Sequence, residues 1–329
     1  FNVATARECT IDKFDNYEIS STGHRILILC DVESIYRRST QATVYDYDVR
    51  RNYLKPLSDA PGKQMIPTFS PDGRMCAYVK DNNIWIRKFD YDTEIQITKD
   101  GKQNAILNGI TDWVYEEEFS VTNLMAWSPD SKVLAFVRSD ESEVPEYSMQ
   151  VYGDGLYPGY YNFKYPKAGE KNSTVSVMAY NVESKDTKKL DIPMDADGYI
   201  PRITFTTKPE QLAVMTLNRQ QNRFNMFYTN PKSGVSKLIL KEENKCYVDS
   251  EWLTSIHFME SGFTYVSEQD GYSHIYLYSP TGVMQRQITK GNWDVTALLG
   301  YDELTKTTYY ESAEESPMRR AVYKIDAKG

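Results

Sequence analysis

A strand–turn–strand pattern that recurs along the chain restricts the possible fold more than any other feature. Residues 66–79 (IPTFSPDGRMCAYV) are echoed by residues 124–137 (LMAWSPDSKVLAFV). Each copy joins two strand-like runs through a tight turn of the Ser-Pro-Asp type, which predicts a β-hairpin. Weaker copies occupy residues 17–29 and 256–266, and others begin at Ile203 and near Val295.

Each hairpin pattern is followed by two more strand-like runs. Residues 84–99 and residues 274–290 are two matching examples, and both end in Ile-Thr-Lys. Four strands at a period of roughly 40–60 residues predict an all-β fold, a β-propeller of four-stranded antiparallel blades. We expect about six to seven blades in this chain, as one incomplete propeller domain over residues 1–329.

Composition supports a folded strand-rich protein and argues against nucleic acid as a partner. Aromatic residues make up 13% of the sequence, including 26 Tyr, and they favour strands. The net charge of −8 is opposite to the basic surface that phosphate binding requires. No apolar run is long enough to span a bilayer. The chain starts at Phe1 without a signal-like segment, so we expect it to be part of a longer protein.

One predicted blade is interrupted by a long insertion. Residues 139–173 are rich in tyrosine and carry Pro145, Pro158 and Pro166 between two strand-like runs. This composition predicts an irregular inserted loop or arm. A loop of this length inside a compact domain is usually functional.

An acidic run, Glu116-Glu117-Glu118, follows the aromatic segment Asp112-Trp-Val-Tyr115, with no Lys or Arg nearby in the sequence. A short acidic run is most often a solvated surface. Carboxylates grouped beside aromatic residues can instead receive an external cation, such as the ammonium of a lysine or of a peptide amino terminus. On a strand, Glu116 and Glu118 would share a face. In a turn or short helix over residues 113–119, Glu117 and Glu118 would be the pair of carboxylates that binds the cation.

Two adjacent arginines, Arg37 and Arg38, interrupt a strand-like stretch over residues 26–49. The default interpretation is that both arginine side chains are simply exposed on the surface. The functional alternative is that one guanidinium binds a carbonyl or carboxylate of a ligand, since its planar fork suits such acceptors.

Motifs for catalysis, metals and cofactors are missing from the sequence. It contains three His, and four Cys without metal-ligand spacing, so free thiols are favoured over a zinc site. No phosphate-binding glycine motif and no G-x-S-x-G nucleophile elbow occurs. We therefore expect no catalytic residues, no metal and no cofactor in this chain, which would be inactive alone.

Several motifs resemble the N-terminal propeller of dipeptidyl peptidase IV, in particular bacterial members of the Bacteroides and Porphyromonas type. The resemblance extends over nearly the whole chain. Its most specific motifs are DWVYEEE (residues 112–118) and YPKAG (residues 165–169), supported by WSP (127–129), EVP (143–145), GYSHI (271–275) and ITKGNW (288–293).

The resemblance implies an eight-bladed propeller in the complete fold and a C-terminal α/β-hydrolase domain that carries the Ser-Asp-His residues beyond this chain. It implies that Glu117 and Glu118 bind the α-ammonium of a peptide and that Arg37 contacts a substrate carbonyl, with Arg38 and Glu116 as rivals. Mammalian members have a Phe-Arg pair where this chain has Glu251-Trp252, so Trp252 is a further candidate contact.

As a whole, the resemblance predicts a serine-type exopeptidase that releases X-Pro or X-Ala dipeptides, located in the periplasm or cell envelope. The expected partners are peptides with a free amino terminus, the chain's own hydrolase domain and a second copy in a homodimer. Two other functions stay open. They are a non-catalytic propeller that binds proteins, and the propeller of a different peptidase of the prolyl oligopeptidase clan.

Overall fold

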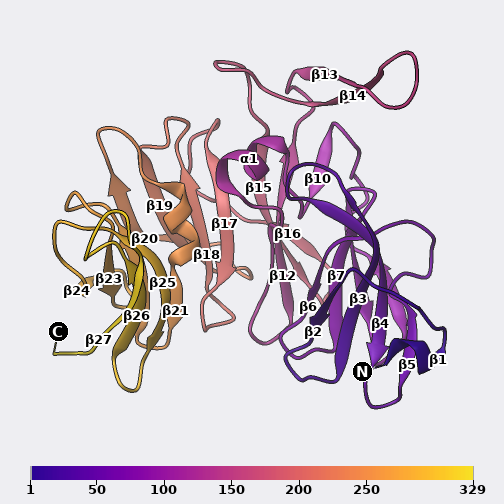
Figure 1. The fold of residues 1–329 in the computed structure, drawn as a ribbon, viewed down its shortest axis with the longest axis horizontal. Helices are drawn as coiled ribbons and strands as arrows, with labels where there is room; N and C mark the ends of the chain where they lie inside the picture. The colour runs from indigo at the N-terminus through magenta and orange to yellow at the C-terminus, as the bar shows by residue number, and fades with distance from the viewer. Residues whose placement is uncertain (1, 329) are drawn as a thin grey trace. The chain divides into compact units, whose positions relative to one another are not determined.

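The computed structural model describes residues 2–328. Residues 1–190 and 191–329 form two compact units, which are described separately. Both units consist almost entirely of antiparallel strands (Figure 1). No helix in residues 2–328 is long and apolar enough to cross a membrane.

The first unit contains three sheets and a separate hairpin. A short 3-10 helix, η1 (Val3–Thr5), precedes the first sheet, whose strands have the order β1-β5-β4-β3-β2. These strands are β1 (Arg7–Glu8), β2 (Asn16–Ile19), β3 (Arg25–Ser34), β4 (Thr40–Asp48) and β5 (Tyr53–Pro56). The second sheet is a simple meander of β6 (Met65–Phe69), β7 (Met75–Lys80), β8 (Asn83–Lys88) and β9 (Thr93–Gln96).

The third sheet has the order β10-β12-β15-β16, and β11 also pairs with β12. Its strands are β10 (Ile106–Asn108), β11 (Met125–Trp127), β12 (Val133–Asp140), β15 (Thr174–Asn181) and β16 (Thr187–Lys189). Strands β10 and β11 pair with successive parts of β12, so they act as two halves of one edge strand. The chain leaves the sheet between these halves and forms the helix α1 (Trp113–Phe119).

The second unit also contains three sheets. The first is a meander of β17 (Tyr199–Phe205), β18 (Leu212–Leu217), β19 (Arg223–Thr229) and β20 (Ser236–Glu243). After the 3-10 helix η2 (Ser250–Ser255), the second is formed by β21 (His257–Met259), β22 (Gly262–Ser267), β23 (His274–Tyr278) and β24 (Met284–Gln287). The third consists of β25 (Val295–Asp302), β26 (Thr307–Ser312) and β27 (Ala321–Ile325).

The repeated Ser-Pro-Asp turns form for a local reason. The Ser70 hydroxyl donates to Asp72 Oδ1 at 2.6 Å and accepts the N–H of Met75 at 3.0 Å, which closes the turn between β6 and β7. Ser128 makes the same two contacts, with Asp130 and Val133, between β11 and β12. Gly73 adopts a φ of +68° in the first turn, a left-handed conformation that glycine tolerates without strain. The predicted hairpins at 66–79 and 124–137 are therefore confirmed.

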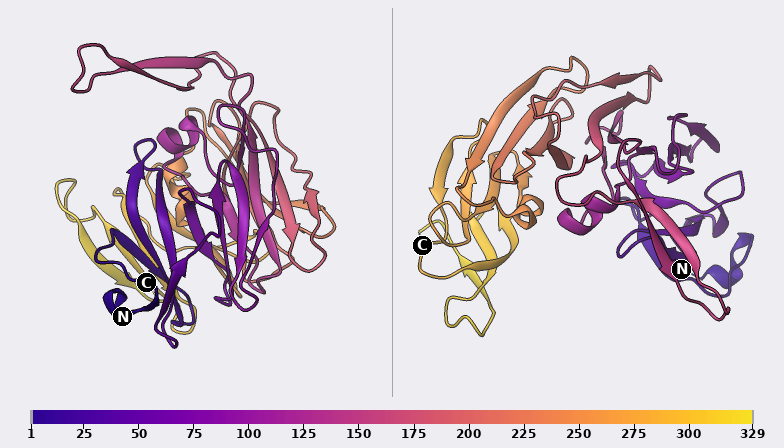
Figure 2. Two further views of the ribbon diagram at one scale, coloured as in Figure 1. Left: turned by 90° about the vertical axis from the view of Figure 1, so that its right-hand side faces the viewer. Right: turned by 90° about the horizontal axis from the view of Figure 1, so that it is seen from above.

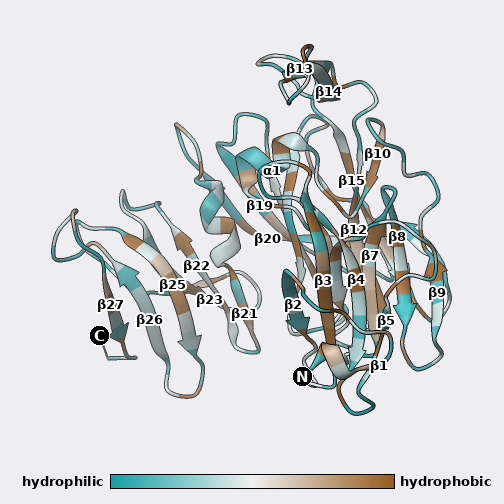
Figure 3. Cartoon of the chain, turned by 45° about the vertical axis from the view of Figure 1, so that its right-hand side comes forward, coloured by the Kyte–Doolittle hydropathy of each residue, from teal (hydrophilic) through white to brown (hydrophobic). Residues whose placement is uncertain are grey.

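The core of each unit is made by the central strands of its sheets. Their buried apolar residues appear as brown stretches on β3, β7 and β12 in Figure 3. Cys30 and Cys76 are buried free thiols in two of these strands, as expected. The continuous buried runs of β7 and β12 are typical of strands covered on both faces of their sheet.

The prediction that residues 139–173 are irregular is wrong. They contain a two-stranded hairpin, β13 (Glu146–Val151) and β14 (Gly159–Lys164), paired in register from Glu146–Lys164 to Val151–Gly159. It extends beyond the end of the third sheet (Figure 2). The six residues of β13 are all exposed, so no buried face imposed the alternation by which strands are recognised in a sequence.

Candidate functional site

The candidate site is organised by helix α1, which lies at the same end of the first unit as the hairpin β13–β14 (Figure 1). Asp112 is the N-cap: its carboxylate accepts the N–H of Tyr115 at 2.9 Å and the hydroxyl of Ser173 at 2.5 Å. Ser120 ends the helix with a φ of +55°, and its N–H bonds to the carbonyl of Tyr115. Both ends of a seven-residue helix are thus fixed by side-chain or backbone partners.

The three consecutive glutamates of α1 occupy different environments. Glu116 is fully buried, and its Oε1 accepts the backbone N–H groups of Arg38 and Ser39, the latter at 2.8 Å. The Glu117 side chain is 19% exposed and accepts Nε of Arg37, which lies 3.0 Å from both carboxylate oxygens. Glu118 is exposed and has no ion pair within residues 2–328. Within the helix, Glu117 is therefore partly exposed and Glu118 is exposed, whereas Glu116 is buried.

The loop between β3 and β4 carries both arginines. The Arg37 side chain is 70% exposed, and within the described residues only its Nε is bonded to Glu117, which leaves the two terminal nitrogens available. Arg38 is also exposed, and its contact with α1 comes from its backbone. Thus the structure places the side chain of Arg37, rather than that of Arg38, against the carboxylate of Glu117.

An aromatic cavity of about 950 Å³ adjoins Arg37 and Glu117. Its rings come from the β3–β4 loop, α1, the hairpin and the segment after the hairpin: Tyr36, Trp113, Tyr147, Tyr161, Phe163 and Tyr165. The centroids of Trp113 and Tyr165 are 4.2 Å apart, which fastens the segment after the hairpin to the helix. The insertion therefore lies beside the helix that carries the glutamate run.

Two buried carboxyl groups, the N-cap Asp112 and the nearby Glu141, have raised pKa values. Burial raises the pKa of Glu141 to about 7, and the nearby charge of Asp112 acts in the same direction. Burial also raises the pKa of Asp112, although its hydrogen bonds from Ser173 and the helix oppose that shift. Glu141 lines a separate polar cavity of about 600 Å³ together with Tyr36 and Tyr161.

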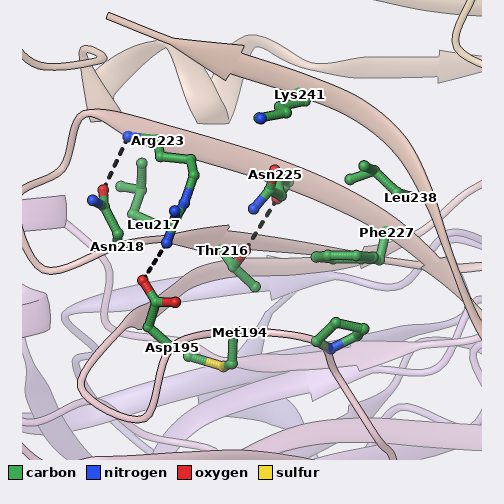
Figure 4. Close-up of a pocket in the computed structure, with 11 residues that line it drawn as sticks. Met194, Asp195, Thr216, Leu217, Asn218, Arg223, Asn225, Phe227, Leu238 and Lys241 are labelled. Carbon is green, nitrogen blue, oxygen red and sulfur yellow. Dashed lines mark hydrogen bonds and ion pairs between the residues drawn. The ribbon is translucent and has the colours of Figure 1, made fainter. Parts of the chain in front are cut away.

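Trp252 belongs to the second unit, where it lies in η2 and packs, partly buried, against Val266, Ile275 and their neighbours. Its indole N–H is buried and has no partner among the described residues. The second unit also has an open cavity of about 600 Å³, shown in Figure 4. Asp195 and Arg223 form an ion pair at its edge, so the charges there are already matched. Glu117, Glu118 and Arg37 therefore form the stronger candidate site.

Several residues of the site escaped the sequence analysis. Ser173 and Ser39 support α1 from elsewhere in the chain, and no sequence signal distinguishes them from other serines. Asp112 could have been found, since an Asp immediately before a helix-compatible run is a recognised N-cap signal. No group of three His, Cys, Asp or Glu side chains suited to a metal occurs in residues 2–328.

This chain is similar to several known proteins. Residues 20–329 match the family described as the dipeptidyl peptidase IV (DPP IV) N-terminal region. The structure superposes on the crystal structure of Porphyromonas gingivalis dipeptidyl peptidase 4 with a TM-score of 0.96 and 65% sequence identity. The match covers 98% of this chain and 46% of that chain. This similarity confirms the predicted all-β propeller fold.

Two curated relatives are more distant. A probable dipeptidyl-aminopeptidase B of Aspergillus niger is 31% identical, over 93% of this chain and 37% of its own length. The prolyl endopeptidase FAP of Mus musculus is 29% identical, over 94% of this chain and 43% of its own length. The chain therefore spans less than half the length of these relatives.

Proposed function

Since this chain belongs to the dipeptidyl peptidase IV N-terminal region family and is of the bacterial type, we propose that it anchors the free amino terminus of peptide substrates for a dipeptidyl peptidase. The observation that carries this proposal is the contact of the partly exposed Glu117 carboxylate with the exposed guanidinium of Arg37, next to Glu118, which is exposed and unpaired among the described residues.

The two carboxylates suit an ammonium group. A peptide α-ammonium has three N–H donors, and charge-assisted hydrogen bonds to carboxylates are among the stronger protein contacts. Glu118 has no competing ion pair in the described residues, and Glu117 shares its charge with Arg37 only. Arg37 then has its terminal nitrogens free to donate to a backbone carbonyl of the same peptide.

Holding the ammonium fixes which peptide bond is presented for cleavage. A nucleophile placed two residues from the anchor would meet the second peptide bond in register, an orientation effect. We place that nucleophile, a serine, in a C-terminal α/β-hydrolase domain of the full-length protein. The products would be X-Pro or X-Ala dipeptides, and the full-length protein would act as a homodimer in the periplasm or cell envelope.

The test compares the full-length protein with its Glu117→Ala and Glu118→Ala variants on a Gly-Pro chromogenic substrate. Each variant should lose roughly 10–100-fold in kcat/KM, since a hydrogen bond to a charged group contributes about 1.5–3 kcal/mol. Glu183→Ala is the matched control: its carboxylate is exposed in the same unit and paired with Lys132. Wild-type activity in both test variants would refute the anchoring role.

A second candidate is an endopeptidase, because the mouse relative is named a prolyl endopeptidase. An endopeptidase does not need a free amine. Cleavage of N-acylated Gly-Pro peptides at the rate of free-amine peptides would favour it. Refusal of the acylated peptides supports the exopeptidase.

A further inference from the structure

We propose that Glu116, the first glutamate of the run, is a positioning residue that holds the Arg37 loop against α1, so that Arg37 and Glu117 face one ligand. This inference rests on the proposed function of Glu117 and Arg37. It assigns Glu116 a role different from substrate binding.

Burial keeps Glu116 from acting as a third ammonium ligand. Its side chain has no exposed surface, and its Oε2 is buried without a hydrogen-bond partner among the described residues. Of the three consecutive carboxylates, one is therefore buried, one is partly exposed and one is exposed. An ammonium bound by Glu117 and Glu118 would remain on the outer face.

Glu116 supplies the acceptor that the β3–β4 loop lacks. Within the loop, the N–H of Ile35 bonds the carbonyl of Ser39 at 2.9 Å, and the N–H of Tyr36 bonds the Ser39 hydroxyl at 3.3 Å. The N–H groups of Arg38 and Ser39 point instead to Glu116 Oε1. The latter two donors lie immediately after Arg37, so the contact fixes the backbone from which the guanidinium extends.

The contact joins two segments that are distant in sequence. Ser39 and Glu116 are 77 residues apart in the sequence. The loop joins two strands of the first sheet, whereas the helix lies between two strands of the third sheet. The Arg37–Glu117 ion pair alone would hold the segments weakly, because Arg37 is largely exposed to solvent. A buried carboxylate that accepts two backbone N–H groups is a firmer link. Glu116 thus sets the distance between the two proposed halves of the peptide site.

The test is a double-mutant cycle in the full-length protein with a free-amine Gly-Pro chromogenic substrate. Glu116→Asp keeps the charge but shortens the side chain by one methylene, so the carboxylate no longer reaches both donors. We expect kcat/KM to fall about 10-fold, the loss of one or two charge-assisted hydrogen bonds. In an Arg37→Ala background, the same substitution should change kcat/KM by less than about twofold, because the group it positions is gone.

Glu143→Asp is the matched control, since Glu143 is exposed in the same unit and paired with Lys171. It should leave kcat/KM unchanged in both backgrounds. If Glu116→Asp fails to fold, as judged by its melting temperature, Glu116→Gln replaces it with a side chain of the same size. Equal losses in the wild-type and Arg37→Ala backgrounds, or no loss at all, would overturn the positioning role.

The same experiment separates this inference from the proposed function. If Arg37→Ala and Glu117→Ala retain wild-type activity, the anchor itself is wrong. If those two lose activity and the Glu116 variants do not, only the positioning role is wrong.

Discussion

Glu141 and Asp112 are two buried carboxyl groups that destabilise each other when both are charged. Glu141 is only 5% exposed, and the charged groups that act on it are Asp112, Asp140 and Lys164. Lys164 is the only cation of these three, and its Nζ already donates to the carbonyl of Val144 at 2.8 Å. Burial and like charge therefore outweigh the attraction, and the pKa of Glu141 rises from 4.5 to about 7.

This shift predicts a pH-dependent effect of Glu141→Gln on stability. Between the unfolded pKa of 4.5 and the folded pKa of about 7, the folded protein holds a proton that the unfolded chain releases. Rising pH therefore lowers the free energy of unfolding of the wild type, by about 3 kcal/mol once Glu141 is charged. Glutamine cannot ionise, so the variant should gain stability relative to the wild type from pH 5 to pH 8.

Melting temperatures of the full-length protein at pH 5 and pH 8 provide the measurement. Glu143→Gln is the control, because Glu143 is exposed. This variant should not gain stability over the wild type as the pH rises from 5 to 8. If the melting temperatures of the wild type and Glu141→Gln differed by the same amount at both pH values, the raised pKa of Glu141 would be contradicted.

At the same residue scale, the sequence singled out Glu117 and Arg37, which the structure brings into contact, but it gave no sign of the contacts of Glu116. The choice between the pairs 116/118 and 117/118 depended on local conformation. The segment is helical and Glu116 is buried, which favours 117/118 as the proposed pair. The donors to Glu116 are backbone N–H groups, which every residue except proline carries. No side-chain pattern could therefore have indicated that contact.

At the scale of elements, α1 is too short to be stable by itself, since isolated helices below about 12–15 residues are marginal in water. Its caps and its buried side chains, Val114, Tyr115, Glu116 and Phe119, hold it in place. The strands, by contrast, were predictable because their turns repeat the same Ser and Asp contacts. The hairpin β13–β14 was not, because its first strand is exposed along its whole length.

The N-cap gives a test of how α1 is held. Asp112→Ala removes the acceptor for the N–H of Tyr115 and for the hydroxyl of Ser173, so it should lower stability by about 0.5–2 kcal/mol. Because α1 carries Glu117 and Glu118, kcat/KM on the Gly-Pro substrate should fall as well. Asp112→Asn is the control, since asparagine is an equally good N-cap. Equal melting temperatures for the Ala and Asn variants would show that the cap does not stabilise this helix.

At the scale of the whole molecule, the hairpin β13–β14 ends in a loop that exposes large apolar side chains. Leu156 is 97% exposed and Tyr157 is 88% exposed. Exposed apolar side chains grouped at the tip of a projecting element are typical of a protein–protein contact. Within its own unit, the strands of this hairpin contribute rings to the aromatic cavity beside Arg37 and Glu117.

We therefore predict that the tip of the hairpin contributes to the proposed homodimer. The double variant Leu156→Ser/Tyr157→Ser should shift the full-length protein from dimer to monomer in light scattering, because it removes apolar area that association would bury. Leu304→Ser/Met318→Ser is the matched control, since those two side chains are 96% and 91% exposed in the second unit. The control should stay dimeric. A dimer that survives the loss of both tip side chains would place the interface elsewhere and leave the hairpin with only its packing against α1.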